Sequence, residues 1–288
     1  MTPRSTTPFA AALDALAERL RERPAVVLSG AGCSTESGIP DYRSPGRPSR
    51  TPMRVQEFMG SAEARARYWA RGAVGWQRFS RARPNGAHKA IAGLEQVGAV
   101  RGIITQNVDG LHQAAGSRRV VELHGSVARV RCTECWAPEG RGGMQARIRD
   151  LNPTFAWEES SVAPDGDAEI PEGAYAGFRV PECLACGGIL KPDVVFFGEN
   201  VPRPVVNDAW RLFDEGEVLL VAGSSLTVFS GRRFVLRAAE RGIPVAILNV
   251  GPTRGDDLAE LRVEGRLGEA LPRLLRALGP AERLSAQG

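Results

Sequence analysis

Residues 29–43 read Ser29-Gly-Ala-Gly-Cys-Ser-Thr-Glu-Ser-Gly-Ile-Pro-Asp-Tyr-Arg43 and follow the short apolar run of residues 25–28. The apolar run predicts a buried strand. A strand that leads directly into Gly-x-Gly and small hydroxyl residues allows a phosphate to approach the backbone. Gly30 and Gly32 lack a Cβ atom, so we expect the chain to turn sharply there and to present N–H groups. This stretch predicts a phosphate-binding loop at the end of a strand.

The residues after this loop do not continue directly into a long helix. Gly38 and Pro40 interrupt helical structure, which predicts that Asp41 and Arg43 lie in a charged loop beside the phosphate site. A charged loop at this position indicates that the bound cofactor is handled chemically as well as held.

The pattern of the remaining chain predicts an α/β fold. Apolar runs of strand length alternate with helical segments, and a closing amphipathic helix is marked by leucines near residues 271–278. This alternation is typical of a doubly wound parallel sheet, which we describe as Rossmann-like. The expected buried strands are residues 25–28, 102–105, 120–123, 217–221 and 245–248.

Composition bounds the class of protein. The chain has 288 residues and is 43% hydrophobic, which suffices for one large core, or for a core with a small module. No apolar run approaches the roughly 20 residues that span a bilayer, so we expect no membrane contact. Residues 1–8 lack the apolar core of a signal peptide, and we expect a cytoplasmic protein. The net charge is +4, but the arginines are dispersed among acids, so we expect no nucleic-acid partner. The sequence does not indicate an oligomeric state.

Four of the five cysteines form two Cys-x-x-Cys pairs. In a chain without a secretion signal, such pairs favour metal binding over disulfides. Four thiolates complete the tetrahedral shell of Zn²⁺, so the predicted zinc is structural. The acid-rich loop between the pairs is unfavourable for nucleic acid. We interpret the fifth cysteine, Cys33, as a small half-buried packing residue. The predicted metal ligands are Cys132, Cys135, Cys183 and Cys186.

Several polar motifs follow the predicted strands. The carboxyl ends of parallel strands meet at one edge of the sheet, where open α/β sheets bind ligands. Each motif alone is a weak signal, because Gly-Ser-Ser is common in loops and Asn-x-Asp in turns. Their shared placement predicts contacts with ribose, phosphate or amide groups. A dehydrogenase would carry an acidic ribose ligand roughly 20 residues after the glycines, and its absence disfavours hydride transfer. The motifs are Gln106-Asn-Val-Asp109, Gly223-Ser-Ser225 and Asn249-Val-Gly251.

His124 follows the third predicted strand, in Glu122-Leu-His-Gly125. A zinc ligand, a buried core residue and a general base are the three roles open to it. The cysteines need no fifth ligand, and an ordinary histidine pKa of about 6.5 suits proton abstraction near neutrality. We therefore predict a general base. The other two histidines, His88 and His112, are predicted to cap or tie helices.

Together with Lys191-Pro-Asp-Val-Val-Phe-Phe-Gly-Glu199, these motifs resemble the sirtuin family, in order and over nearly the whole chain. The resemblance implies an NAD-dependent protein lysine deacylase (deacetylase) with one structural zinc. It also implies one catalytic domain, at about residues 5–282. Its predicted parts are an NAD-binding domain (1–49, 98–128 and 190–288), a helical module (50–97) and a zinc-ribbon module (129–189). Features of the class II, sirtuin-4-like branch are Tyr42 and residues 67–71, 74–76, 163–167 and 251–257.

The resemblance also implies residue roles. In the implied reaction the acyl oxygen attacks the anomeric carbon of NAD as nicotinamide leaves. His124 then takes a proton from a ribose hydroxyl, which attacks the amidate. The products are free lysine, nicotinamide and O-acyl-ADP-ribose. The implied catalytic residues are His124, Asn107, Asp109 and Arg43. The implied NAD-binding residues are Gly30, Ala31, Gly32, Ser34, Thr35, Ile39, Pro40, Asp41, Tyr42, Arg43, Gln106, Asn107, Asp109, His124, Gly223, Ser224, Ser225, Asn249, Val250, Gly251 and Leu267. The implied substrate-binding residues are Tyr68, Arg71, Val194, Val195, Phe196, Phe197, Gly198 and Glu199.

Two questions stay open at the level of sequence. Tyr68 and Arg71 form a Tyr-x-x-Arg pattern similar to one that binds an acidic acyl group in the desuccinylating sirtuin branch. The alternative is an aromatic–arginine pair that only packs the helical module. The loop of residues 151–178 is either solvated or reaches back to the acyl pocket. Rival functions are protein mono-ADP-ribosyl transfer at the same NAD site and an NAD- or ADP-ribose-binding module without turnover.

Overall fold

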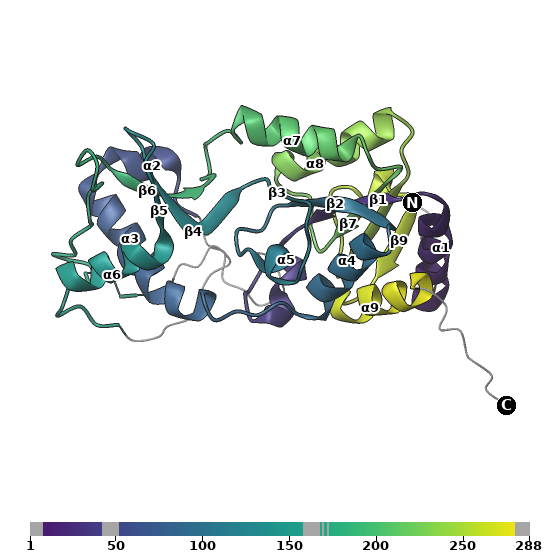
Figure 1. The fold of residues 1–288 in the computed structure, drawn as a ribbon, viewed down its shortest axis with the longest axis horizontal. Coiled ribbons are helices and arrows are strands. Elements are labelled where there is room, and N and C mark those ends of the chain that lie inside the picture. Colours follow the sequence, from purple (N-terminus) through teal and green to yellow (C-terminus); the bar gives the residue numbers. More distant parts are fainter. Residues whose placement is uncertain (1–7, 42–51, 158–167, 169, 172, 280–288) are drawn as a thin grey trace.

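The computed structural model describes residues 8–41, 52–157, 168, 170–171 and 173–279. A six-stranded sheet, parallel throughout, forms the larger lobe (Figure 1). The predicted doubly wound parallel sheet is confirmed. In spatial order its strands are β3 (Val120–Glu122), β2 (Val100–Thr105), β1 (Ala25–Ser29), β7 (Val218–Ala222), β8 (Val245–Asn249) and β9 (Leu261–Glu264).

Helices cover both faces of this sheet, and the central strand is therefore buried on both sides. Val27 belongs to the core on one face, whereas Val26 and Leu28 belong to the core on the other. This explains why β1 reads as an unbroken apolar run rather than an alternating one. One face carries α1 (Phe9–Glu22), α4 (Gly86–Gln96) and α9 (Leu267–Leu278), and the other carries α7 (Arg203–Phe213) and α8 (Phe229–Glu240) (Figure 1).

A smaller lobe packs three helices against an antiparallel three-stranded sheet (Figure 1). Phe58, Trp69 and Met144 lie at the centre of its core. Its elements are α2 (Val55–Gly60), α3 (Ala62–Phe79), β4 (Gly125–Cys132), β5 (Pro138–Gly140), α6 (Arg141–Leu151) and β6 (Leu190–Val194). The predicted helical stretch 50–97 divides in space, because α4 packs against α9 and β2 on the larger lobe.

A small third group of apolar side chains connects the lobes. It contains Ile39 from the glycine loop, Phe79 from α3, Leu111 from α5 (Leu111–Ala114) and Val127 from β4. The start of β4 thus lies against the edge of the large sheet, and its end lies in the smaller lobe. None of the helices in the described ranges is both long and apolar enough to cross a membrane.

Candidate nucleotide-binding and catalytic site

The loops that follow β1, β2, β7 and β8 meet at one edge of the large sheet. Backbone hydrogen bonds join them: Gln106 N–H donates to Ser29 O at 2.9 Å, and Gly223 N–H donates to Leu248 O at 3.0 Å. The loops that carry the polar motifs therefore lie together at the carboxyl ends of the strands, as predicted.

The N–H groups of Gly30 and Gly32 are not free to bind a phosphate, contrary to the prediction from the sequence. Gly30 N–H donates to Ala222 O at 3.0 Å and Gly32 N–H donates to Gly223 O at 2.9 Å, so both groups join the two loops instead of pointing to a phosphate. A Cβ atom on Gly30 would lie 2.8 Å from the Gly223 oxygen. Gly223 itself has φ = 67°, a conformation that favours glycine. These glycines are required for the close approach of the loops after β1 and β7.

We expect Gly30→Ala to destabilise the fold and to weaken NAD binding. The added methyl group overlaps backbone and must displace one loop, for which overpacking typically lowers stability by about 1–3 kcal/mol. Thermal unfolding and calorimetric titration with NAD measure both effects. Gly60→Ala is the matched control, because a Cβ atom there has nothing within 4 Å. Equal stability and equal NAD affinity of Gly30→Ala and the wild type would contradict this account.

Asn107 and Asp109 hold the glycine loop from the neighbouring strand end. The Asn107 amide donates to Gly30 O at 3.1 Å and to Ser34 Oγ at 3.0 Å, and the Ser34 hydroxyl donates to Asp109 Oδ2 at 2.6 Å. Burial raises the pKa of Asp109, and the hydrogen bonds from Ser34 and the Leu111 N–H oppose this shift. The motif is a connected polar network at the site, rather than a simple turn.

Two of the three histidines have the structural roles that the sequence predicts. His88 completes a capping box at the start of α4, where its Nδ1 accepts the Asn85 N–H. His112 Nε2 lies 2.8 Å from the Ser29 hydroxyl of β1 and ties α5 to the sheet. Burial lowers the pKa of His88 to about 4 and that of His112 to about 3, so both rings are neutral near pH 7.

His124 directly follows Leu123 at the end of β3 and is held by two hydrogen bonds. Its Nδ1 lies 2.9 Å from the carbonyl oxygen of Gln106, and its Nε2 lies 2.7 Å from the hydroxyl of Ser230. Burial lowers its pKa below the ordinary 6.5, Arg233 adds to this, and the Gln106 bond opposes it. The ordinary pKa expected from sequence is therefore wrong in value. The shift keeps the imidazole neutral, as a base must be.

The glycine after His124 allows the smaller sheet to reach this site. Gly125 has φ = 78°, and a Cβ atom there would lie 2.0 Å from the Asp193 oxygen. Gly125 therefore lets β6 pass directly beside the histidine. Val195 N–H then donates to His124 O at 2.9 Å.

The predicted substrate segment, residues 194–199, continues from β6 past His124. Glu199 fixes its bend: its carboxylate accepts the Phe196 N–H at 2.7 Å and pairs with Lys191 at 3.0 Å. Phe197 leaves 46% of its surface exposed, so an apolar side chain stands beside the site.

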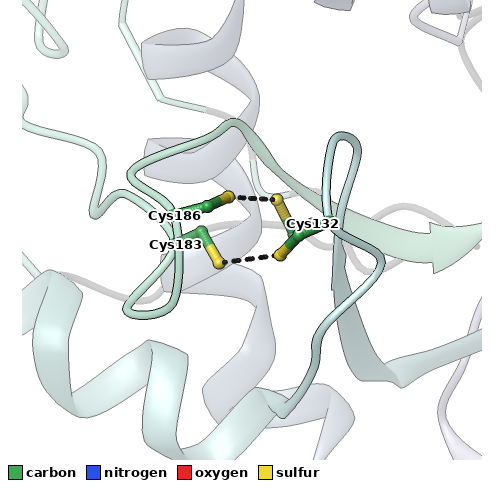
Figure 2. Close-up of side chains that lie close together, drawn as sticks. Cys132, Cys183 and Cys186 are labelled. Carbon is green, nitrogen blue, oxygen red and sulfur yellow. Dashed lines mark hydrogen bonds between the residues drawn. The ribbon is translucent and has the colours of Figure 1, made fainter.

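The four predicted zinc ligands come together at the end of β4 and before β6 (Figure 2). The Cys132 and Cys186 sulfurs are 3.5 Å apart, and those of Cys135 and Cys183 are 3.6 Å apart. Zn–S bonds of about 2.3 Å in a tetrahedron place sulfurs about 3.8 Å apart, so this donor set fits Zn²⁺. The group contains only cysteines, which leaves His124 outside it.

Cys33 is fully rather than half buried, and burial beside Asp109 raises its pKa and keeps it protonated.

Tyr68 and Arg71 lie one turn apart on α3 and have different surroundings. Tyr68 is buried between Phe58 and Phe196, with ring centroids 5.4 and 5.1 Å away. Arg71 pairs with Ala168 in both directions: its Nε donates to Ala168 O at 3.0 Å, and Ala168 N–H donates to its carbonyl at 3.1 Å. Ala168 of the 151–178 loop therefore contacts α3 at Arg71.

The other predicted NAD ligands lie on the same loops or at their ends. Asn249 ends β8, and its amide donates to Val250 O and Gly251 O at 2.9 and 3.0 Å, which closes that loop. Ser224 donates to Gln106 Oε1 at 2.6 Å, and Leu267 begins α9. Two predicted NAD ligands, Tyr42 and Arg43, lie outside the described residues. The remaining predicted ligands lie on the glycine loop; they are Ala31, Thr35, Ile39, Pro40 and Asp41. Ser230 was not predicted, because no local motif marks it.

Known proteins are similar to this chain over most of its length. A family model described as the Sir2 family matches residues 30–230. NAD-dependent protein deacetylase 1 of Mycobacterium avium is 52% identical over 91% of this chain and 94% of its own length. Human NAD-dependent protein lipoamidase sirtuin-4, mitochondrial, is 50% identical over 86% of this chain and 80% of its own length.

The fold agrees with this likeness in sequence. A solved Sir2–p53 peptide–NAD⁺ complex superimposes with a TM-score of 0.75 and 30% identity, and covers 92% of this chain and 97% of the other. The chain belongs to the Sir2 family, the sirtuins.

Proposed function

We propose that this protein is an NAD-dependent protein lysine deacylase. The observation that carries the proposal is the position of His124, whose Nδ1 is bonded to Gln106 O so that Nε2 is the basic nitrogen. The His124 carbonyl accepts the Val195 N–H, so this residue lies beside the 194–199 segment, on the sheet edge that also carries the Asn107–Asp109 network. Support comes from relatives named deacetylase and lipoamidase, and from a solved Sir2 neighbour bound to a propionylated peptide.

The residues of the site have distinct tasks in this reaction. NAD supplies the leaving nicotinamide and the ribose that receives the acyl group. His124 Nε2 accepts the ribose hydroxyl proton, and burial keeps it neutral for that step. Asn107 and Asp109 fix the glycine loop against the β2 end, where the nicotinamide and its ribose would lie. The 194–199 segment would add the peptide as a strand and bring its acyl-lysine to His124.

Zinc would be held by the four cysteines and take no part in the chemistry. Four thiolates fill its coordination shell, so no position is left for substrate or water. Its role would be to fix the segment before β6, and through β6 the peptide-binding residues.

The direct test is a panel of acyl-lysine peptides incubated with NAD and followed by mass spectrometry. A deacylase releases free lysine peptide, nicotinamide and O-acyl-ADP-ribose in equal amounts. Label from NAD retained on protein, without O-acyl-ADP-ribose, would identify a mono-ADP-ribosyltransferase instead. No release of nicotinamide with any peptide would indicate a binding module without turnover.

We further propose that Arg71 biases the enzyme toward acidic or branched acyl groups. The support is its place on α3 one turn after Tyr68, whose ring contacts Phe196 of the peptide-binding segment. We expect glutaryl- or hydroxymethylglutaryl-lysine to turn over faster than acetyl-lysine, and Arg71→Ala to reduce that ratio about tenfold, through loss of a charge-assisted bond. Succinyl and lipoyl peptides complete the panel.

Arg67→Ala is the matched control on the same helix, because Arg67 pairs with Glu57, whereas Arg71 bonds Ala168. The ranking of acyl peptides should be the same in Arg67→Ala and the wild type. An unchanged ranking in Arg71→Ala would leave this arginine a purely structural role in holding Ala168.

A further inference from the structure

The hydrogen bonds around His124 place a second side chain on the nitrogen that the proposed reaction uses. A carbonyl oxygen only accepts, so the hydrogen of the 2.9 Å bond to Gln106 is on Nδ1, and Nε2 carries the lone pair. The Ser230 oxygen lies 2.7 Å from Nε2. The Ser230 hydroxyl therefore donates to the lone pair of the base. The two bonds together set the tautomer and the plane of the ring.

The position of Ser230 is set by close packing of α8 on Gln106. Ser230 is the second residue of α8, and a Cβ atom on the next residue, Gly231, would lie 2.6 Å from the Gln106 side-chain nitrogen. Gln106 is fixed in turn by the Ser224 hydroxyl, which donates to its Oε1 at 2.6 Å. One residue thus orients His124 through its carbonyl group and supports the turn that carries Ser230 through its side chain.

We propose that Ser230 is a positioning residue for the general base. Its hydroxyl holds His124 Nε2 before the substrates bind, and it gives up this hydrogen bond when the ribose hydroxyl arrives. This inference rests on the proposed deacylase function. The lone pair of Nε2 accepts one hydrogen, so the Ser230 hydroxyl must rotate about its Cα–Cβ bond when the ribose hydroxyl arrives. The ribose O–H bond then breaks and its proton moves to Nε2, while the ribose oxygen bonds to the amidate carbon, whose C=N π electrons pass to the lysine nitrogen. Ser230 keeps its own proton throughout.

The charges around His124 determine the direction of the expected pH effect. The positive charge of Arg233 on α8 lowers the pKa of His124 in addition to burial. Glu122 on β3 is engaged with Arg129 at 2.8 Å. A hydroxyl that donates to Nε2 stabilises the neutral imidazole and acts in the same direction as burial. Loss of the Ser230 hydroxyl therefore raises the pKa of His124. Because the neutral base is the active form, the acid limb of the rate profile moves to higher pH.

The experiment compares the wild type with Ser230→Ala by two independent measurements. The chain has only three histidines, so NMR titration of histidine-labelled protein follows His124 directly. The second measurement is kcat/KM for an acyl peptide against pH. We expect the His124 titration to move to higher pH in Ser230→Ala. Loss of one hydrogen bond should lower kcat/KM about three- to tenfold on the acid side, with near wild-type values above the limb.

Two further variants separate positioning from folding. Ser230→Thr keeps the hydroxyl and should restore both the titration and the rate profile. Ser80→Ala removes an exposed hydroxyl that bonds only Gln77 O among the described contacts, and should change neither. A Ser230→Ala protein with the wild-type titration and the wild-type profile would overturn the proposal, even if its thermal stability were lower. Failure of the proposed function gives a different result: the wild type consumes no acyl peptide, while the His124 titration still responds to Ser230→Ala.

Discussion

His124→Ala is expected to lower deacylation by about 10²–10⁴-fold, the usual contribution of a positioned acid–base group. The reason is that Nε2 is the basic atom of a residue whose backbone pairs with the peptide-binding segment. Its neighbour Ser230 has no basic nitrogen to replace it. His124 is close to neutral over the working pH range because burial lowers its pKa, so its loss removes an active base rather than a charge. Mass spectrometry of peptide products under single-turnover conditions measures the effect.

The stage at which His124 acts gives this prediction an internal control. In the proposed reaction nicotinamide leaves before the ribose hydroxyl loses its proton. His124→Ala should therefore retain exchange of labelled nicotinamide into NAD, while formation of free lysine stops. Deacylation at the wild-type rate in this variant would remove His124 from the mechanism.

The large sheet could be predicted because its central strands are buried on both faces. β1, β7 and β8 are each buried along their whole length, so the sequence shows continuous apolar runs. The edge strand β9 was missed because Leu261-Arg-Val-Glu264 buries only Val263 fully. In the 129–189 segment α6 was missed because its Gly-Gly start and many arginines conceal the periodicity of its two buried apolar residues, Met144 and Ile148.

The candidate site could be predicted where residues follow strands, and only there. Asn107, His124 and Asn249 stand at strand ends, so parallel pairing places them along one edge of the sheet once the strands are known. Ser230 could not be found this way, because its contact with His124 depends on how closely α8 packs over Gln106. The direction of the Gly30 and Gly32 N–H groups likewise depends on the loop after β7, which is distant in sequence.

Loss of one zinc ligand is the second change for which we expect a large effect. Cys135→Ser removes a thiolate at an exposed position, so it alters metal binding without opening a cavity in the core. Zinc binding contributes roughly 10–16 kcal/mol to the folding of small zinc modules, which exceeds the stability of most domains. We therefore expect less than one zinc per chain by elemental analysis. We also expect rapid hydrogen exchange in β4 and β6, with β1 and β7 still protected.

Activity should fall with the metal although zinc takes no part in the reaction. Cys186 lies just before β6, and β6 continues into the 194–199 segment beside His124. When the cysteines no longer hold this chain end, β6 loses its register with β4, and the peptide-binding residues lose their position. Deacylation should then drop more than tenfold, while NAD binding at the large sheet is retained. Cys33→Ala is the matched control, since Cys33 lies outside the cysteine tetrad, and it should keep one zinc per chain. Full activity of zinc-free Cys135→Ser would show that β6 is held by the core of the smaller lobe alone.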